Sequence, residues 1–255
     1  RVDKIDYRMD EEQVPDRVHI YKVESPVKDK LESLGMLLRS LGDQSTIVFL
    51  NYRDSVERTN KYLVEQGFST SFFHGGLEQK EREASLYRFS NGSANILVST
   101  DLASRGLDIP DIDNIIHYHM PESEDGYIHR VGRTARWEAQ GRAFFLLGPE
   151  EHIPDYVDAE VEDYEIPAVE ELPMPAKPKM ATLYIGKGKK DKISKGDILG
   201  FLCKKGGLNS SEIGKIDVND RYAYAAIARP KLRSVLNNVK GEKIKGVKTI
   251  VEEVR

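Results

Sequence analysis

The stretch TIVFLNYRDSVERTNKYLVEQGFSTSFF, residues 46–73, contains one complete strand–helix–strand unit. Residues 46–50 are rich in apolar and β-branched side chains, which favour a strand. Residues 54–66 have the spacing of apolar side chains that is typical of a helix, and residues 70–73 form a second apolar strand. Because a helix joins the two strands, we expect them to lie parallel in one sheet.

The same alternation extends along the chain on both sides of this unit. Further strands are expected at 18–23, 95–99, 114–118 and 142–147, and further helices at 28–41, 79–90 and 123–131. This order predicts an α/β domain, in which a parallel sheet has helices on both faces. In such sheets, the residues that contact ligands gather in loops beyond the carboxyl ends of the strands.

The net charge of −4 is the sum of two segments of opposite charge. Residues 179–255 contain 18 lysines and arginines against 8 acidic residues, a net charge of +10, so the remainder carries −14. Segments that differ this much in charge are expected to be separate domains. The basic segment invites a polyanionic partner, although a solvated lysine-rich surface would explain the same charge.

A linker is predicted between the two domains. Residues 150–171 carry ten acidic side chains and no lysine or arginine, and the proline-rich stretch PMPAKPK (173–179) follows. This composition is typical of a linker, although its start, at 150–158, is compatible with packing on the first domain. The predicted organisation is a first domain at 1–150, a linker at 151–178 and a second domain at 179–255.

Cysteine content and hydropathy predict a cytoplasmic protein without a membrane segment. No apolar run is long enough for a membrane helix, and no stretch resembles a signal peptide. The single cysteine, Cys203, excludes an internal disulfide and fits a reducing compartment. It lies in the apolar pattern ILGFLC, so we interpret it as a buried small hydrophobic residue rather than a nucleophile.

The second domain is predicted to be small and of the α+β class. Strands are expected at 181–186, 212–218, 222–228 and 246–254, and helices at 195–207 and 230–239. The resulting order β-α-β-β-α-β is the ferredoxin-like arrangement, which many RNA-binding domains of the RNA-recognition-motif (RRM) type use.

Three tyrosines of this domain are predicted to lie exposed on one face of its sheet. Strand alternation puts Tyr222 and Tyr224 on the same face of one strand and points Tyr184 outward from another. Such a platform can stack unpaired bases, each stack contributing roughly 1–3 kcal/mol. The alternative is that the tyrosines cover a helix or the linker. Nearby lysines that can contact phosphates are Lys187, Lys189 and Lys190.

Three motifs in the first domain place polar residues in loops near strand ends. HRVGRTAR (129–136) contains three arginines, whose planar forks of donors fit phosphate oxygens. ILVSTDLASRGLDIP (96–110) follows a strand with hydroxyls, backbone N–H groups and Arg105, where a phosphate can dock. HGGLEQKERE (74–83) forms a glycine turn before a helix. Taken singly, each motif has an ordinary structural alternative: a salt-bridge network, a βα loop or a solvated helix start.

Taken together and in this order, the motifs resemble the second RecA-like domain of DEAD-box RNA helicases. The resemblance spans about residues 14–150 and includes IVFLNYRDSV (47–56). Two positions depart from the family pattern, because Ala135 stands where glycine is usual and Trp137 follows the last arginine of the motif. Alanine adds only a methyl group, so we expect the geometry of the arginines to be retained.

The resemblance implies a role for each matching residue. Arg133 and Arg136 resemble the two arginines that reach the γ-phosphate of ATP across the cleft between two lobes. Asp108 resembles the residue that contacts the ribose, and Gly106 belongs to the same loop. The resemblance further implies RNA contacts for Thr100, Arg105, Gly106, Gln79 and Arg82, and coupling between the ATP and RNA sites for His129 and Arg130.

The residues that would complete an ATP site do not occur in these 255 residues. There is no GxxxxGK[ST] phosphate loop and no Asp-Glu-Ala-Asp sequence. In the family that the motifs resemble, both belong to the first lobe, which also holds Mg²⁺. We therefore expect ATP to bind between this chain and a first RecA-like lobe, no metal site here, and no ATP hydrolysis by this chain alone.

The C-terminal segment carries a second resemblance, to the specificity domain of DbpA-type DEAD-box helicases. The matching stretches are LYIGKGKKDKISKGDILGFL (183–202), EIGKIDV (212–218), YAYAAIA (222–228) and KGVKTIVEE (245–253). That domain is an RRM variant that binds a hairpin of the large-subunit (23S) ribosomal RNA. The resemblance implies the C-terminal part of a monomeric, ATP-dependent RNA helicase that unwinds or remodels ribosomal RNA during ribosome assembly.

Two other functions remain open from the sequence. The chain could be a stand-alone RNA-binding protein without a motor lobe, which the absence of an initiator methionine and the retention of both arginines disfavour. It could also belong to a related DNA helicase, which the RNA-type second domain disfavours.

Overall fold

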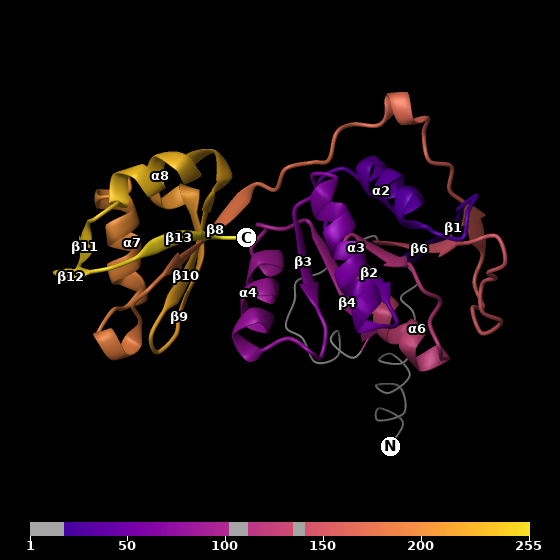
Figure 1. Ribbon diagram of the computed structural model, residues 1–255, viewed down its shortest axis with the longest axis horizontal. Helices are drawn as coiled ribbons and strands as arrows, with labels where there is room; N and C mark the ends of the chain where they lie inside the picture. Colours follow the sequence, from indigo (N-terminus) through magenta and orange to yellow (C-terminus); the bar gives the residue numbers. More distant parts are fainter. Residues whose placement is uncertain (1–17, 102–111, 135–140) are drawn as a thin grey trace, which may run out of the picture. The chain divides into compact units, whose positions relative to one another are not determined.

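The computed structural model describes residues 18–101, 112–134 and 141–255 (Figure 1). The chain divides into two compact units. The first comprises residues up to 177 except 87–94, and the second comprises residues 178–255 together with 87–94. Within the described residues, no helix combines the length and the apolar character that crossing a membrane requires.

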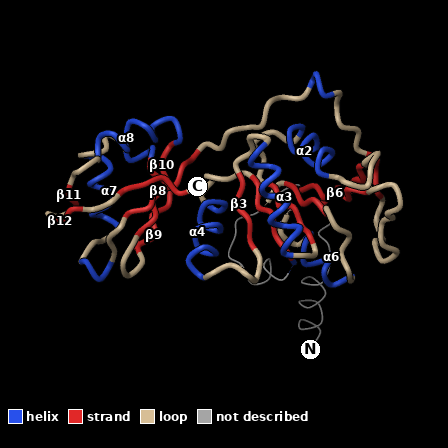
Figure 2. The backbone as a smooth tube through the Cα atoms, viewed as in Figure 1, coloured by secondary structure: helices blue, strands red, loops and turns tan. Residues whose placement is uncertain are grey.

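The first unit is built on a seven-stranded sheet in which every pairing is parallel. The strand order is β3-β4-β2-β5-β6-β1-β7. The strands are β1 Val18–Glu24, β2 Thr46–Leu50, β3 Thr70–Phe73, β4 Ile96–Thr100, β5 Asn114–His117, β6 Gly141–Leu147 and β7 Val161–Asp163. The helices are α2 Leu31–Ser40, α3 Arg53–Glu65, α4 Gln79–Ser90 and α6 Glu124–Val131, and they flank the sheet (Figure 2). The last four residues of α4, 87–90, belong to the second unit. The predicted α/β fold with a parallel sheet is confirmed.

The core of this unit forms where the apolar stripe of α2 meets the sheet. Leu34, Leu37 and Leu38 of the helix are buried at helical spacing. They belong to one cluster with Val48 of β2 and Phe144 of β6. Burying a side chain of this size stabilises the fold by roughly 1.5–3 kcal/mol, so the leucine spacing that predicts the helix also fixes which face it buries.

The segment predicted as a linker packs on the first unit instead. Residues 161–163 form β7, which pairs with β1, and the Tyr164 ring lies edge-on to the Phe144 ring at 5.1 Å. Further along, the Arg39 guanidinium donates to the carbonyls of Leu172 and Pro173 at 3.1 and 2.8 Å. Packing therefore continues beyond 158, because apolar side chains between the acidic residues find places on the sheet edge and on α2.

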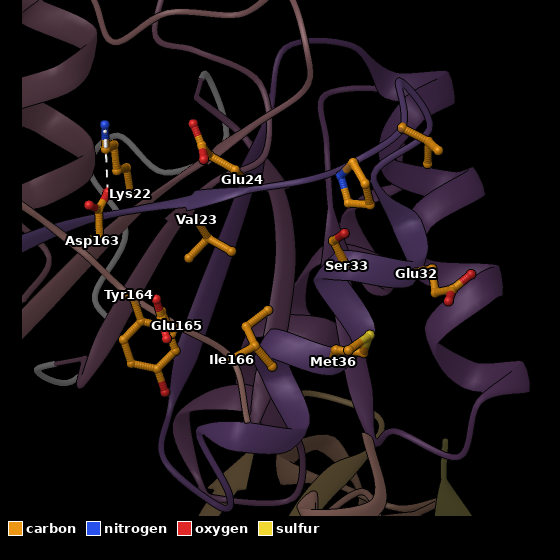
Figure 3. Close-up of a pocket in the computed structure, with 12 residues that line it drawn as sticks. Lys22, Val23, Glu24, Glu32, Ser33, Met36, Asp163, Tyr164, Glu165 and Ile166 are labelled. Carbon is orange, nitrogen blue, oxygen red and sulfur yellow. Dashed lines mark ion pairs between the residues drawn. The ribbon is translucent and has the colours of Figure 1, made fainter. Parts of the chain in front are cut away.

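A cavity of about 830 Å³ lies between β1, α2 and the segment after β7 (Figure 3). Met36 and Ile166 contribute apolar surface to it, and Lys22 forms an ion pair with Asp163 at 3.6 Å on its border. Residues 163–166 of the acidic segment thus form one wall of this cavity.

The second unit contains a four-stranded antiparallel sheet in the order β13-β8-β10-β9. Its strands are β8 Met180–Ile185, β9 Ile213–Val218, β10 Ala223–Ala228 and β13 Val251–Val254, and its helices are α7 Lys195–Lys204 and α8 Leu232–Val239. The predicted strand at 246–254 is interrupted, because β12 Val247–Lys248 pairs with β11 Lys243–Ile244 in a separate hairpin. Single 3-10 turns occupy Val169–Glu171, Lys189–Asp191, Ser210–Glu212 and Arg229–Lys231.

Strand alternation builds the core of the second unit as predicted. Ala223, Ala225 and Ile227 of β10 point into the core with Leu183 and Ile185 of β8, and all five are fully buried. Both helices contribute apolar residues to the same cluster. Cys203 is only half-buried, since α7 buries the neighbouring Phe201 and Leu202 instead.

Candidate functional site

Helix α6 carries the first half of the HRVGRTAR motif at the carboxyl edge of the sheet. The helix begins at the Ser123 cap, whose hydroxyl accepts from the Gly126 N–H at 3.0 Å. Its last turn contains His129, which is exposed, and Arg130, which is fully buried. Two arginines only three positions apart therefore have different environments, because Arg133 lies beyond the helix end and is half-buried.

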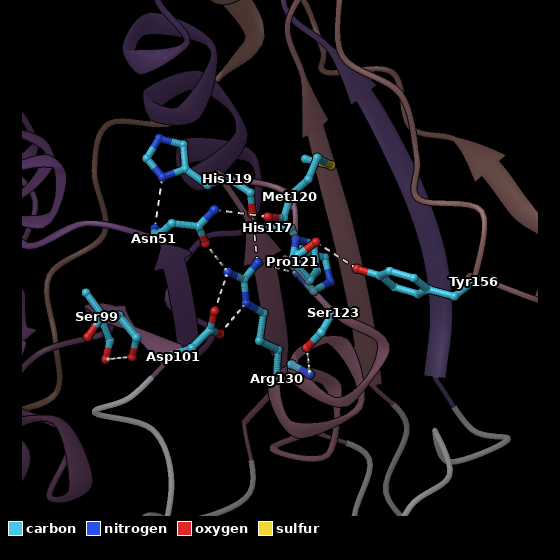
Figure 4. Close-up of polar contacts among 12 residues, drawn as sticks. Asn51, Ser99, Asp101, His117, His119, Met120, Pro121, Ser123, Arg130 and Tyr156 are labelled. Carbon is cyan, nitrogen blue, oxygen red and sulfur yellow. Dashed lines mark hydrogen bonds and ion pairs between the residues drawn. The ribbon is translucent and has the colours of Figure 1, made fainter.

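The buried Arg130 guanidinium is the centre of a polar network (Figure 4). It pairs with the Asp101 carboxylate through Nε at 2.5 Å and Nη2 at 2.8 Å. Nη2 also donates to Asn51 Oδ1 at 2.7 Å, and Nη1 donates to the His119 carbonyl at 2.7 Å and to His117 Nδ1 at 3.2 Å. A buried charge is tolerated only when it is paired in this way. The network joins α6 to the ends of β2, β4 and β5.

Two histidines beside Arg130 are held in the neutral form. Burial and the nearby Arg130 charge lower the pKa of His117 well below its ordinary value. Burial, with the charges of Lys30 and Arg130, lowers the pKa of His119 to about 4. A neutral ring can accept a hydrogen bond, and His119 Nδ1 accepts from the Asn51 backbone N–H at 2.9 Å. Both rings therefore serve as acceptors at neutral pH.

A second buried cation, Lys30, lies near His119. Its ammonium donates to the carbonyls of Tyr118 and Leu146 and to Glu151 Oε1, the last at 2.6 Å. Burial lowers the pKa of Lys30, while Glu151 opposes that shift. This group borders a cavity of about 910 Å³ at the carboxyl ends of β5 and β6. The ammonium ties the start of α2 to those strand ends.

The segment after α6 is anchored on both sides of Arg133. The Arg133 carbonyl accepts from the Ile112 N–H at 3.0 Å, and the Thr134 hydroxyl donates to the Ile112 carbonyl. Thr134 is fully buried, which fixes the backbone next to Arg133. Four of the residues singled out from the sequence lie outside the described residues: Arg105, Gly106, Asp108 and Arg136.

The glycine turn after β3 is stabilised from within. His74 Nδ1 accepts from the Gly76 N–H at 2.9 Å, and His74 Nε2 contacts Glu57 at 2.7 Å. The Arg82 guanidinium donates to the carbonyls of Gly75 and Leu77 at 2.8 and 3.0 Å. Arg82 therefore holds the shape of the turn.

Gln79 and Thr100, the other predicted RNA contacts that the structure describes, lie at the same edge of the sheet but differ in exposure. Gln79 is exposed at the start of α4, where its amide donates to Glu83 at 3.2 Å. Thr100 ends β4 and is buried, directly before Asp101 of the network.

In the second unit the three tyrosines gather on one sheet face. The Tyr184 and Tyr222 rings stack at 5.9 Å, and Tyr224 lies 6.1 and 5.4 Å from them. Tyr184 and Tyr222 are half-buried, but Tyr224 is only 3% exposed. The prediction of three exposed rings is thus wrong for Tyr224, because β10 is an inner strand and the Tyr87 ring, which belongs to the same unit, stacks on Tyr224 at 5.2 Å.

A basic loop lies beside this face, between β8 and α7. Lys189 and Lys190 are exposed, and their backbone N–H groups donate to the carbonyls of Asn219 and Asp220 at 2.8 Å each. A side chain at Gly188 would place its Cβ 2.1 Å from the Asn219 carbonyl oxygen, so only glycine allows this approach. Lys187 is half-buried at the start of the loop. The loop is held against the β9–β10 turn.

The structure adds residues that the sequence did not single out. Asn51, Asp101 and His119 complete the network around Arg130, and Lys30 forms a buried ion pair with Glu151. The sequence feature that they share is their position, because four of them follow the carboxyl end of a strand. Many other loop residues have the same position, so this feature does not distinguish the network residues from their neighbours.

Each unit matches a known domain family. Residues 29–138 match the helicase conserved C-terminal domain, and residues 182–253 match the DbpA RNA binding domain. The chain is 35% identical over 228 residues to the ATP-dependent RNA helicase DbpA of Escherichia coli, covering 88% of this chain and 50% of that protein. It is 30% identical over 245 residues to DbpA of Bacillus subtilis, covering 86% and 51%. The chain spans about half the length of these curated relatives.

Solved structures resemble the first unit. The E. coli DEAD-box protein SrmB, solved with regulator of ribonuclease activity A, superposes with a TM-score of 0.55 and 30% identity, covering 63% of this chain and 97% of that one. A DEAD box protein from Methanococcus jannaschii superposes with a TM-score of 0.55 and 26% identity, covering 60% and 43%.

The fold and the matches define a RecA-like helicase C-terminal lobe that is followed by an RNA-binding domain. More narrowly, this pair of domains places the chain with the DbpA-like DEAD-box RNA helicases, whose C-terminal part it matches.

Proposed function

We propose that the first unit completes the ATP site of an RNA helicase when a first RecA-like lobe closes on it. The observation that carries this proposal is the position of Arg133, on a backbone segment anchored by the Arg130 network and by buried Thr134. An always-charged guanidinium on a fixed segment suits the charge that develops on a phosphoryl group during transfer. Arg136, three residues further on, would add a second cation.

ATP and Mg²⁺ would be shared unequally between the lobes. The arginines of this chain fit a triphosphate, and Asp108 with Gly106 would meet the ribose side of the nucleotide. Within the described residues, no group of three acidic, histidine or cysteine side chains is placed to hold a metal ion. We propose that the first lobe holds Mg²⁺, where it neutralises phosphate charge, and that this chain alone does not turn over ATP.

RNA would contact both units. In the first, RNA would meet the first turn of α4, with Gln79 and Arg82, and the end of β4 at Thr100, after which Arg105 and Gly106 follow in the sequence. His129 and Arg130 would couple these residues to the ATP site, and the bidentate Arg130–Asp101 pair supports this because it joins α6 to the residue after β4.

The second unit would tether the enzyme to its RNA. The stacked Tyr184 and Tyr222 rings offer a platform for unpaired bases, with Tyr224 as its buried support, while Lys187, Lys189 and Lys190 supply charge beside it. A loop-bearing RNA hairpin suits this combination. We propose a hairpin of 23S ribosomal RNA, bound by a monomeric cytoplasmic enzyme during ribosome assembly.

The test joins this chain to the first RecA-like lobe of a DbpA helicase and measures RNA-stimulated ATP hydrolysis. We expect Arg133→Ala and Arg136→Ala each to lower kcat by about 10³-fold or more. Arg58→Ala, which removes an exposed arginine of the same lobe, is the matched control. Unchanged turnover in both arginine variants would refute the assignment. RNA binding with no hydrolysis in the joined wild type would favour a stand-alone RNA-binding protein.

A further inference from the structure

Asn51, directly after β2, bonds to two other segments of the first unit. Its side-chain Oδ1 accepts from Arg130 Nη2 at 2.7 Å, and its Nδ2 donates to the Met120 carbonyl at 3.1 Å. Its backbone N–H donates to His119 Nδ1 at 2.9 Å. One residue therefore joins the ends of β2 and β5 to α6 (Figure 4).

Asn51 lies at the point in the sheet where the direction of the strand order reverses. In the order β3-β4-β2-β5-β6-β1, strands β2 and β5 are neighbours, but the chain leaves β2 towards β3 and leaves β5 towards β6. The crevice between two such strands, at their carboxyl ends, is where open α/β sheets bind ligands. Asn51 and His119 bond to each other across these two strand ends.

The bond from Asn51 also restricts the Arg130 guanidinium. The Phe49 ring lies 5.3 Å from the guanidinium carbon, and the carboxylate of Asp101 holds Nε and Nη2 on one edge. Asn51 adds the second acceptor of Nη2, so rotation of the group would break a bond to a buried charge. Hydrogen bonds to charged groups are roughly twice as strong as neutral ones.

Arg130 lies in the last turn of α6, directly before the segment that carries Arg133. The Arg133 N–H donates to the Arg130 carbonyl at 3.3 Å, so Arg133 follows one turn after the clamped side chain. We propose that Asn51 is a positioning residue: it sets the orientation of Arg130, and through it the place of Arg133, without touching the nucleotide. The proposal rests on the phosphate role of Arg133 in the proposed function.

Two substitutions at this position separate positioning from stability. Asn51→Ala removes the acceptor for Arg130 and the donor to Met120. Asn51→Asp retains the acceptor for Arg130, in a form that binds the cation more strongly, but it replaces the donor to Met120 by a second acceptor oxygen. The matched control is Asn114→Ala, because Asn114 Oδ1 also accepts from an arginine, Arg142 Nε at 3.1 Å, but at the opposite end of β5.

The first readout is RNA-stimulated ATP hydrolysis by the chain joined to a first lobe. We expect Asn51→Ala to lower kcat roughly ten-fold with less than a two-fold change in the KM for ATP, because a misplaced arginine loses transition-state contacts first. Asn51→Asp should recover most of that loss, and Asn114→Ala should leave kcat unchanged. Equal kcat in Asn51→Ala and Asn114→Ala would overturn the proposal.

The second readout needs no activity. In this chain labelled with ¹⁵N-arginine, NMR measures how fast the Arg130 Nη protons exchange with water. Asn51→Ala should speed that exchange at least ten-fold, while Asn51→Asp and Asn114→Ala should leave it close to wild type. An unchanged rate of Arg130 Nη proton exchange in Asn51→Ala would refute the proposal that Asn51 sets the orientation of Arg130. A joined wild-type protein without RNA-stimulated hydrolysis would instead refute the proposed function, and the exchange rates would still decide the orientation of Arg130.

Discussion

Replacing Arg130 by methionine tests whether the buried network holds the first unit together. Methionine fills much of the same volume, so the change removes the charge and the donors more than it removes packing. It leaves the Asp101 carboxylate, Asn51 Oδ1 and the His119 carbonyl without the donors that satisfy them here. The cost is therefore that of unpaired polar groups rather than of an empty cavity.

The expected magnitude follows from the burial of the two partners. Removing one member of a buried ion pair typically destabilises a protein by about 3–5 kcal/mol. Arg130 is fully buried, whereas the Asp101 side chain is 28% exposed, so water can solvate part of the abandoned carboxylate. We expect the low end, about 3 kcal/mol, which corresponds to a fall in Tm of roughly 6–12 °C for a domain of this size.

Urea unfolding followed by far-UV circular dichroism measures the effect. Arg58→Met is the matched control, because Arg58 pairs with Asp29 at 2.7 Å but both side chains are more than half exposed, and its loss should cost less than about 1 kcal/mol. If Arg130→Met costs no more than Arg58→Met, the network does not stabilise the fold.

Three further outcomes are expected. The first unit should lose stability as pH falls from about 6.5 towards 4, because His117 and His119 stay neutral when folded while the unfolded chain takes up protons. The free energy of unfolding should fall by at most about 1.4 kcal/mol per pH unit for each histidine. In urea titrations, a His117→Asn, His119→Asn double variant should show a weaker dependence on pH. Gly188→Ala should destabilise the second unit by about 1–3 kcal/mol in calorimetry, since its Cβ would overlap the Asn219 carbonyl, whereas Gly200→Ala, with open space around it, should not. The affinity of the chain for a hairpin RNA should fall steeply with salt, and Lys189→Ala with Lys190→Ala should reduce that slope by about 1–2, whereas Tyr222→Ala should lower affinity and leave the slope unchanged.

The sequence by itself determined the two fold classes and most of the longer helices and strands. Local signals suffice for this, because the leucines at 31–41 and the alternating residues at 223–228 each mark a buried face within a few residues. The charge contrast marked the second domain for the same reason, since charge is a property of composition. The motifs also located Arg130 and Arg133, although nothing in their spacing separates a buried arginine from a half-buried one.

Only the tertiary structure decided which polar groups meet. Asn51, Asp101 and Arg130 are up to 79 positions apart, and they converge because parallel strands bring their carboxyl ends to one edge of the sheet. The same holds for the acidic segment, whose packing depends on an open sheet edge beside β1, and for Tyr224, which the Tyr87 ring covers. Contacts between distant residues depend on strand order, and strand order is not written in any local pattern.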